Sequence, residues 1–83
     1  MDKLLISLYV PSLQMDFDLF VPENLMIREL IKLLVEGVKD LSGGKYKISG
    51  RELLCVKGAN ILLSENLSLS DYRLRDGERL VLF

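Results

Sequence analysis

The chain changes its hydrophobic period after residue 22, and this change limits most strongly the folds that it can adopt. In residues 3–10 (KLLISLYV) and 15–21 (MDFDLFV), apolar side chains recur at every second position, which is the period of a β-strand. Pro11-Ser12-Leu13 supplies a turn between them, so the two strands are predicted to form an antiparallel hairpin. Residues 25–41 follow the helical period instead, and a helix that comes directly after a hairpin can pack across its sheet.

The helical segment carries an apolar stripe and a signal at each end. Asn24 is predicted to cap the first turn, and Gly43 or Gly44 to end the helix in the left-handed conformation. Five residues build the stripe: Ile27, Leu30, Ile31, Leu34 and Val38. Three further apolar residues lie outside it: Met26, Leu33 and Val35. They widen the apolar arc to about 200°, against the roughly 100° of a typical surface helix, so the helix has more apolar surface than its core needs.

The second half of the chain completes the sheet. Residues 52–56 (ELLCV) are predicted as a third strand, 57–60 as a turn, 61–63 as a short fourth strand and 78–83 as the last strand, entered through the tight turn Asp76-Gly77. Ser68 and Asp71 have the spacing of a capping box, which predicts a single helical turn that ends by Tyr72. The sequence therefore predicts one α+β domain over residues 1–83, with a mixed sheet of four to five strands crossed by one helix.

Composition and charge exclude several functions. A net charge of −1 argues against nucleic acid as the main partner, because phosphate binding needs a cationic face. A single cysteine allows neither an intramolecular disulfide nor a cysteine-rich metal site. The N-terminal residues lack the pattern of a signal peptide, and no segment reaches the roughly 20 apolar residues that span a bilayer. We expect a cytoplasmic protein that does not insert into a membrane.

Residues that could carry catalysis are scarce. The sequence has no histidine, so Cys55 lacks its usual activating partner and is expected to act as a small hydrophobic residue in a strand. Asp16 and Asp18 share one strand face, where solvated charges discourage edge pairing. The segment SGGK (Ser42–Lys45) resembles part of a phosphate loop, but Tyr46 follows the lysine and the segment leaves a helix instead of opening one. We therefore expect no enzyme, no metal site and no cofactor.

The order of elements resembles the β-grasp fold, and LSDY (Leu69–Tyr72) resembles the corresponding turn of ubiquitin-like proteins. In that family the tyrosine hydroxyl ties the turn to a neighbouring loop, which implies the same role for Tyr72. FDLFVPENLMIRELIKLL (Phe17–Leu34) and the final DGERLVLF resemble the YukD/EsaB proteins, small ubiquitin-like proteins of bacterial type VII secretion systems. The resemblance spans essentially the whole chain.

The β-grasp resemblance places the first, last and third strands side by side, and it turns the apolar surplus into a candidate site. If Leu80 and Leu82 face inward, then Val81 and Phe83 face outward, as Leu5 does on the first strand. The third strand leaves two alternatives, because either Leu53 and Cys55 or Leu54 and Val56 can be internal. Four residues are the candidate protein-binding residues: Leu5, Leu54, Val81 and Phe83. We expect them to form one contiguous patch on the face that ubiquitin uses for recognition.

The resemblance also implies what such a patch would do. Ubiquitin is conjugated through a flexible tail that ends in Gly-Gly, whereas this sequence ends on Phe83 within a predicted strand. The resemblance implies a non-conjugated accessory or regulatory protein, which docks on cytoplasmic domains of membrane components of type VII secretion. Two alternatives stay open: a homodimer that buries its own patch in a structural role, and a truncated modifier or sulfur carrier.

Overall fold

The computed structural model describes residues 2–59 and 61–83. The elements follow the order expected from the sequence. They are the strands β1 (Lys3–Val10) and β2 (Met15–Pro22), the helix α1 (Ile27–Leu41), the strands β3 (Leu54–Val56) and β4 (Ile61–Leu62), the 3₁₀-helix η1 (Ser70–Tyr72) and the strand β5 (Glu78–Leu82). The expected turn at 57–60 includes Asn60 and so lies partly outside the described residues.

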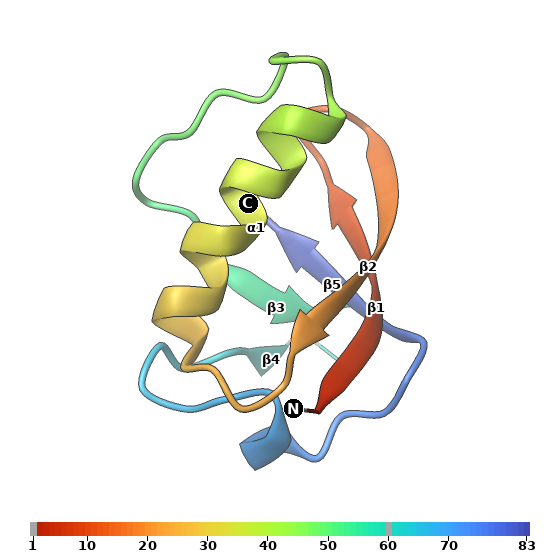
Figure 1. The fold of residues 1–83 in the computed structure, drawn as a ribbon, viewed down its shortest axis with the longest axis vertical. Helices are drawn as coiled ribbons and strands as arrows, with labels where there is room; N and C mark the ends of the chain where they lie inside the picture. The colour runs from red at the N-terminus through yellow and green to blue at the C-terminus, as the bar shows by residue number, and fades with distance from the viewer. Residues whose placement is uncertain (1, 60) are drawn as a thin grey trace.

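The strands form one five-stranded sheet in the order β2-β1-β5-β3-β4. β1 and β5 are parallel, and the other neighbouring strands are antiparallel. The helix α1 crosses one face of this sheet, as Figure 1 shows. The expectation of an α+β fold with a mixed sheet and one crossing helix is confirmed, and so is the placement of the first, last and third strands side by side.

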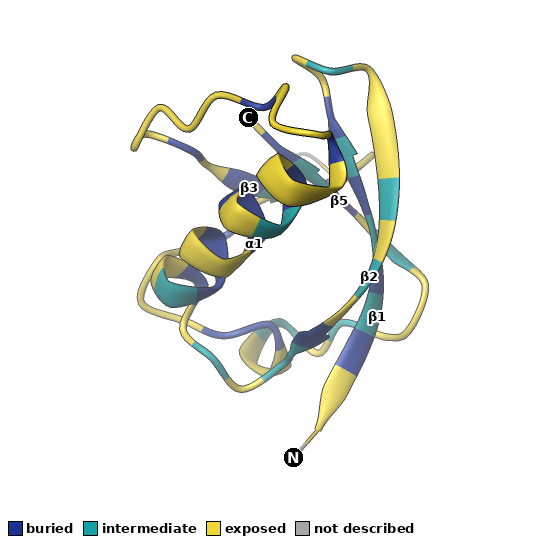
Figure 2. Cartoon of the chain, turned by 45° about the horizontal axis from the view of Figure 1, so that its top comes forward, coloured by how far each residue is buried: buried dark blue, intermediate teal, exposed yellow. Residues whose placement is uncertain are grey.

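The hydrophobic core lies between α1 and the sheet (Figure 2). All five residues of the expected helical stripe are buried. Val35, expected outside the stripe, is buried as well, because Ile48 and Gly50 of the loop after the helix lie beside it. The sheet supplies the fully buried residues Ile6, Leu8, Val10, Leu54, Leu80 and Leu82.

The start of α1 differs from the sequence-based expectation. Asn24 does not cap the helix, since the helix begins at Ile27 and no side chain caps its first turn. Two backbone carbonyls of a distant loop replace the cap. The N–H of Ile27 donates to the carbonyl of Leu67 at 2.7 Å, and the N–H of Arg28 donates to that of Glu65 at 3.2 Å. These bonds satisfy donors that would otherwise be unpaired at a helix start. At the other end, Gly43 and Gly44 adopt positive φ as expected.

One buried carboxylate organises the segment between α1 and β3. Glu52, expected to start the third strand, lies before β3 and is 8% exposed. Its oxygens accept hydrogen bonds from the N–H groups of Ser49 at 2.7 Å and Gly50 at 3.1 Å, and from the hydroxyl of Tyr46 at 3.0 Å. Burial, together with the hydrogen bond to Glu52 and its charge, raises the pKa of Tyr46 to about 12. Tyr46 is therefore a buried residue between the exposed residues 43–45 and 47–51.

The turn before β5 has the expected hydrogen bonds. The N–H of Ser68 donates to Oδ2 of Asp71 at 2.8 Å, and the N–H of Asp71 donates to Oγ of Ser68 at 3.3 Å, which confirms the capping box. The hydroxyl of Tyr72 accepts a hydrogen bond from the N–H of Ser64 at 2.7 Å. The tyrosine thus ties η1 to the loop after β4, as the ubiquitin-like resemblance implies.

Candidate docking surfaces

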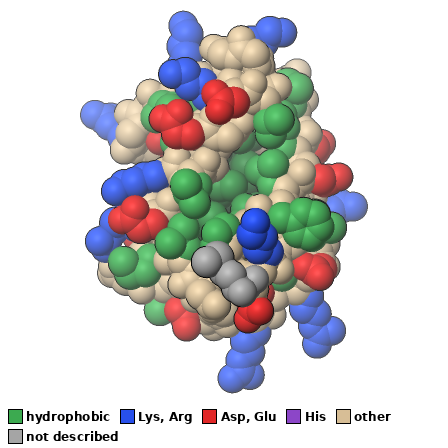
Figure 3. Space-filling model, in the orientation of Figure 1, with side chains coloured by type: hydrophobic (Ala, Val, Ile, Leu, Met, Phe, Trp, Pro, Cys, Tyr) green, Lys and Arg blue, Asp and Glu red, His purple; other side chains and the backbone are tan. Residues whose placement is uncertain are grey.

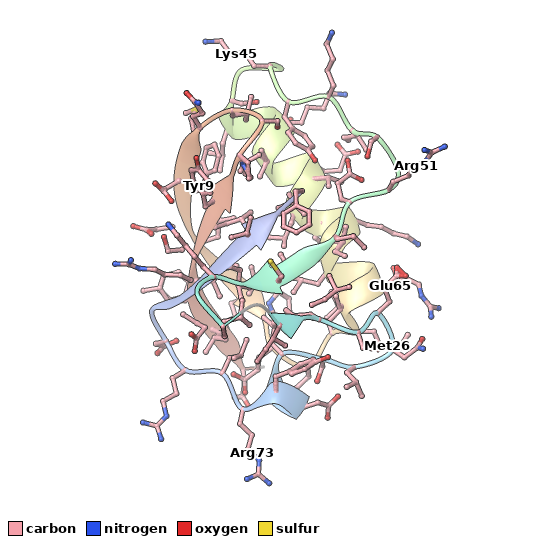
Figure 4. The ribbon with its side chains drawn as sticks, turned by 180° about the vertical axis from the view of Figure 1, so that it is seen from behind. Tyr9, Met26, Lys45, Arg51, Glu65 and Arg73 are labelled. Carbon is pink, nitrogen blue, oxygen red and sulfur yellow. The ribbon has the colours of Figure 1, made fainter. Side chains whose placement is uncertain are left out.

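The face of the sheet opposite α1 is the first candidate surface, and Figure 4 views the molecule from this side, with Tyr9 of β1 labelled. The register decides which side chains share it. Tyr9 lies opposite Val81, and Val81 lies opposite Cys55, which in turn lies opposite Leu62. Phe83 and Leu53 exchange two backbone hydrogen bonds just beyond the ends of β5 and β3. Side chains on directly opposed residues project to the same face, so this face is rich in apolar residues.

The structure places three of the four candidate binding residues at the surface. Phe83 is 55% exposed, and Val81 and Leu5 are half-buried. Leu54 is fully buried, and its assignment as a binding residue is wrong. It lies opposite Leu82 in the sheet, so both side chains enter the core. Because side chains alternate along a strand, Leu53 and Cys55 face outward instead.

The expected contiguous patch is also divided. Leu5 is separated from Val81 along the sheet by the opposed pair Ser7 and Arg79. A polar depression of about 380 Å³ lies there, lined by Ser7, Tyr9, Asp16, Asp18, Lys57 and Arg79. The ammonium of Lys57 sits 5.1 Å from the centre of the Tyr9 ring, a cation–π distance. Leu5 therefore lies on the other side of this polar depression from Val81, and it does not extend the apolar surface around Phe83.

The remaining apolar surface on this face is compact, and we call it the outer apolar strip. It consists of Leu53, Cys55, Leu62, Val81 and Phe83. Cys55, whose side of the sheet the sequence leaves open, is half-buried and belongs to this strip. Sequence reasoning misses Leu62 and leaves the side of Leu53 open, since only the pairing register shows which side of β3 and β4 faces outward.

A second apolar surface lies between α1 and the edge strand β2, and we call it the α1–β2 groove. It has a volume of about 160 Å³ and is lined by Leu19, Phe20, Val21, Pro22, Leu30, Leu33, Leu34 and Gly37. Phe20 is 69% exposed and Leu33 is 54% exposed. Figure 3 shows hydrophobic side chains gathered between α1 and β2. The sequence contains a partial signal for this groove, because Leu33 lies outside the core stripe of the helix.

Both candidate surfaces are built mainly from apolar side chains. Among residues 2–59 and 61–83, no three His, Cys, Asp or Glu side chains are grouped to hold a metal ion. The sequence has no histidine to activate Cys55. In the same described residues, no helix has the length and apolar character needed to cross a membrane. What both surfaces offer is exposed hydrophobic area next to charged groups, which is typical of protein-binding sites.

Solved structures share this fold at low sequence identity. The EccD5 ubiquitin-like domain of Mycobacterium xenopi is 21% identical with a TM-score of 0.71, over 100% of this chain and 94% of that one. The ubiquitin-like domain of Plasmodium falciparum Dsk2 is 20% identical with a TM-score of 0.70, over 99% and 100%. A chain of the MycP5-free ESX-5 inner membrane complex is 17% identical with a TM-score of 0.72, over 100% of this chain and 21% of that one.

These likenesses show that the fold is the ubiquitin-like β-grasp. A comparison with proteins of curated function found no match. The sequence does match a family described as "WXG100 protein secretion system (Wss), protein YukD", and the match covers residues 6–82. This match covers nearly the whole chain, and the described fold agrees with it. The chain therefore belongs to the YukD family of ubiquitin-like proteins of the WXG100, or type VII, secretion system.

Proposed function

We propose that this chain is a non-conjugated docking protein of a type VII secretion system. It acts in the cytoplasm and binds a cytoplasmic domain of a membrane component through the outer apolar strip. The observation that carries the proposal is the exposed apolar surface at the end of β5, where Phe83 is 55% exposed beside Leu53 and Val81. Membership of the YukD family supports the assignment to a type VII secretion system.

The structural neighbours support the choice of partner. One of them is a chain of the ESX-5 inner membrane complex. The protein described here aligns over its whole length with 21% of that longer chain. A ubiquitin-like fold is thus compatible with assembly at a secretion membrane. The proposed mode of action is recognition: apolar residues of the strip are desolvated against the partner, and the flanking charges set the orientation.

Val81→Asp tests the proposal. The substitution puts a charge at the centre of the strip. A buried interface would have to desolvate this charge without an opposite charge beside it, so the binding free energy should become less favourable by several kcal/mol. A pull-down of membrane secretion components from the source cells reports this loss. Asn66→Asp is the matched control, because it adds the same charge on an exposed loop and keeps the oxygen that accepts from Arg28.

Sedimentation separates docking from self-association. A wild-type protein that sediments as a monomer and loses its membrane partner through Val81→Asp supports the proposal. A wild-type dimer that Val81→Asp converts to a monomer favours a homodimer that buries the strip. A folded Val81→Asp protein that keeps both its partner and its association state contradicts a role for the strip in binding.

A further inference from the structure

We propose that the α1–β2 groove binds an extended peptide strand that has alternating apolar residues and flanking lysine or arginine residues. The peptide adds to the sheet beside β2. This surface is separate from the outer apolar strip, and the inference does not rest on the function proposed for the strip.

The backbone of β2 is open to a further strand. β2 lies at the edge of the five-stranded sheet, and among the described residues β1 is the one strand paired with it. On β1, Leu5 directs its N–H to Asp76 and its carbonyl to the N–H of Gly77, which lie on the side of β5. Alternate residues of a strand direct their backbone N–H and carbonyl groups to opposite sides. The backbone groups of Leu4 and Ile6 therefore point toward β2, where Val21 and Leu19 lie opposite them.

The same alternation sets the free positions of β2. Asp16, Asp18 and Phe20 are the residues whose N–H and carbonyl groups point away from β1, toward the open edge. These groups can pair with an added strand, which is how exposed sheet edges bind extended peptides. The main-chain bonds would supply affinity, and the side chains that enter the neighbouring groove would supply specificity.

The groove suits side chains of such a strand. Its volume of about 160 Å³ lies below the roughly 300–1,000 Å³ of small-molecule sites, so it fits individual apolar side chains better than a compact ligand. Gly37 opens the groove on the helix side, since a glycine there leaves the surface of α1 without a side chain. A Cβ built on Gly37 would meet nothing within 4 Å.

The charges around the groove select a basic peptide. On α1, three acidic residues follow the same line as Leu33 at helical spacing: Glu29, Glu36 and Asp40. Asp16 and Asp18 project from β2 to the face of the sheet opposite α1, where an added strand would also direct every second side chain. Figure 3 shows acidic side chains on both sides of the apolar surface. Lysine or arginine residues that flank an apolar strand would meet these carboxylates, whereas an acidic peptide would be repelled.

The same aspartates disfavour a second copy as the occupant. An antiparallel pairing of two β2 strands centred on Phe17 would place Asp16 of each chain opposite Asp18 of the other. Centring the pair on Asp18 would place two aspartates directly opposite each other. Like charges at opposed positions destabilise a sheet, so a basic strand from another protein fits this edge better than β2 itself does.

The experiment uses the whole chain and two fluorescent synthetic peptides of about ten residues, long enough for one strand. Both have valine and isoleucine alternating with threonine. One has two lysines at each end, and the other has two glutamates. Fluorescence anisotropy at low salt should show at least tenfold tighter binding of the lysine-flanked peptide. Amide hydrogen exchange should show new protection at Asp16, Asp18 and Phe20.

Gly37→Phe is the variant that tests the groove, because its Cβ would meet nothing within 4 Å and its ring can occupy the apolar space beside it. It should weaken binding of the lysine-flanked peptide at least tenfold, with a thermal melt to confirm that the fold remains. Ile48→Phe is the matched control: it adds the same ring beside Val35, on the opposite side of α1, without a change of charge, and should leave binding unchanged.

Four results would overturn the inference. They are equal affinity for the two peptides, full binding by a folded Gly37→Phe protein, new protection at the outer apolar strip instead of β2, and a peptide-free dimer with protected β2 amides. If Gly37→Phe unfolds, Leu33→Lys at the exposed rim replaces it, with the same expected loss of binding.

Discussion

At the residue scale, Glu52 shows how one buried carboxylate fixes a loop. Three donors converge on it, from Ser49, Gly50 and Tyr46. Burial alone raises the pKa of a carboxyl, but hydrogen bonds from the backbone and from Tyr46 outweigh it, so the pKa of Glu52 lies below its ordinary value of 4.5. The charged form is therefore the one that holds the segment between α1 and β3.

The sign of this shift predicts a pH dependence. Because the folded pKa is depressed, the charged carboxylate stabilises the fold above the ordinary value of 4.5, and this stabilisation is lost as the pH falls through the lower folded value. Glu52→Ala should lower the free energy of unfolding by about 2 kcal/mol or more at pH 7, since it leaves three donors unpaired. Urea unfolding at pH 7 and pH 3 checks this. An equal loss at both values would contradict the role of the charge.

Tyr72 gives a second prediction at this scale. Its hydroxyl is the hydrogen-bond partner of the N–H of Ser64. Tyr72→Phe removes this acceptor and should lower the free energy of unfolding by about 1 kcal/mol. Chemical denaturation of the variant is the measurement, and Tyr9→Phe is a control on the outer face. A Tyr72→Phe protein as stable as wild type would show that water replaces the hydroxyl fully.

At the element scale, β3 shows where pattern reading reaches its limit. The segment ELLCV has apolar residues on both alternations, so the period of two does not choose a face. The pairing with β5 makes the choice, because Leu54 lies opposite Leu82 and Cys55 opposite Val81. A long-range contact thus fixes which residues enter the core, and the local sequence does not contain it.

A pair of substitutions tests the orientation of β3. Leu54→Ala should lower the free energy of unfolding by about 2–5 kcal/mol, because the side chain is fully buried and leaves a cavity. Leu53→Ala removes the same atoms from an exposed neighbour and should cost less than about 1 kcal/mol. Thermal or urea unfolding of both variants is sufficient. A larger loss for Leu53→Ala than for Leu54→Ala would mean that β3 turns its other face to the core.

The two ends of α1 also differ in whether nearby or distant residues determine their structure. The glycines that follow the helix take positive φ as the sequence predicts, because a residue without a Cβ adopts the left-handed conformation without a steric penalty. The start could not be predicted, since carbonyls of Glu65 and Leu67 take the place of a cap. Strands and helix follow from hydrophobic period, whereas the features made by loops that meet in space do not.

At the scale of the whole molecule, the two apolar surfaces lie on different sides of one small sheet. The sequence predicts a surplus of apolar surface and the fold that carries it. It does not predict how this apolar surplus divides, because the charged residues around Ser7 come from β2, from β5 and from the turn after β3. The outer apolar strip and the α1–β2 groove are therefore properties of the folded sheet, and each can be altered by a substitution that leaves the other in place.

The most direct test of the docking account is an NMR titration of the ¹⁵N-labelled chain with the cytoplasmic domain of the membrane component that the wild-type protein captures. Desolvation of the outer apolar strip should shift the amide signals of Leu53, Leu62 and Phe83 most strongly, because these are the exposed residues of the strip that become buried. Signals on the far side of α1, such as that of Lys32, should stay in place. Shifts confined to α1, with the signals of the strip unchanged, would contradict the account.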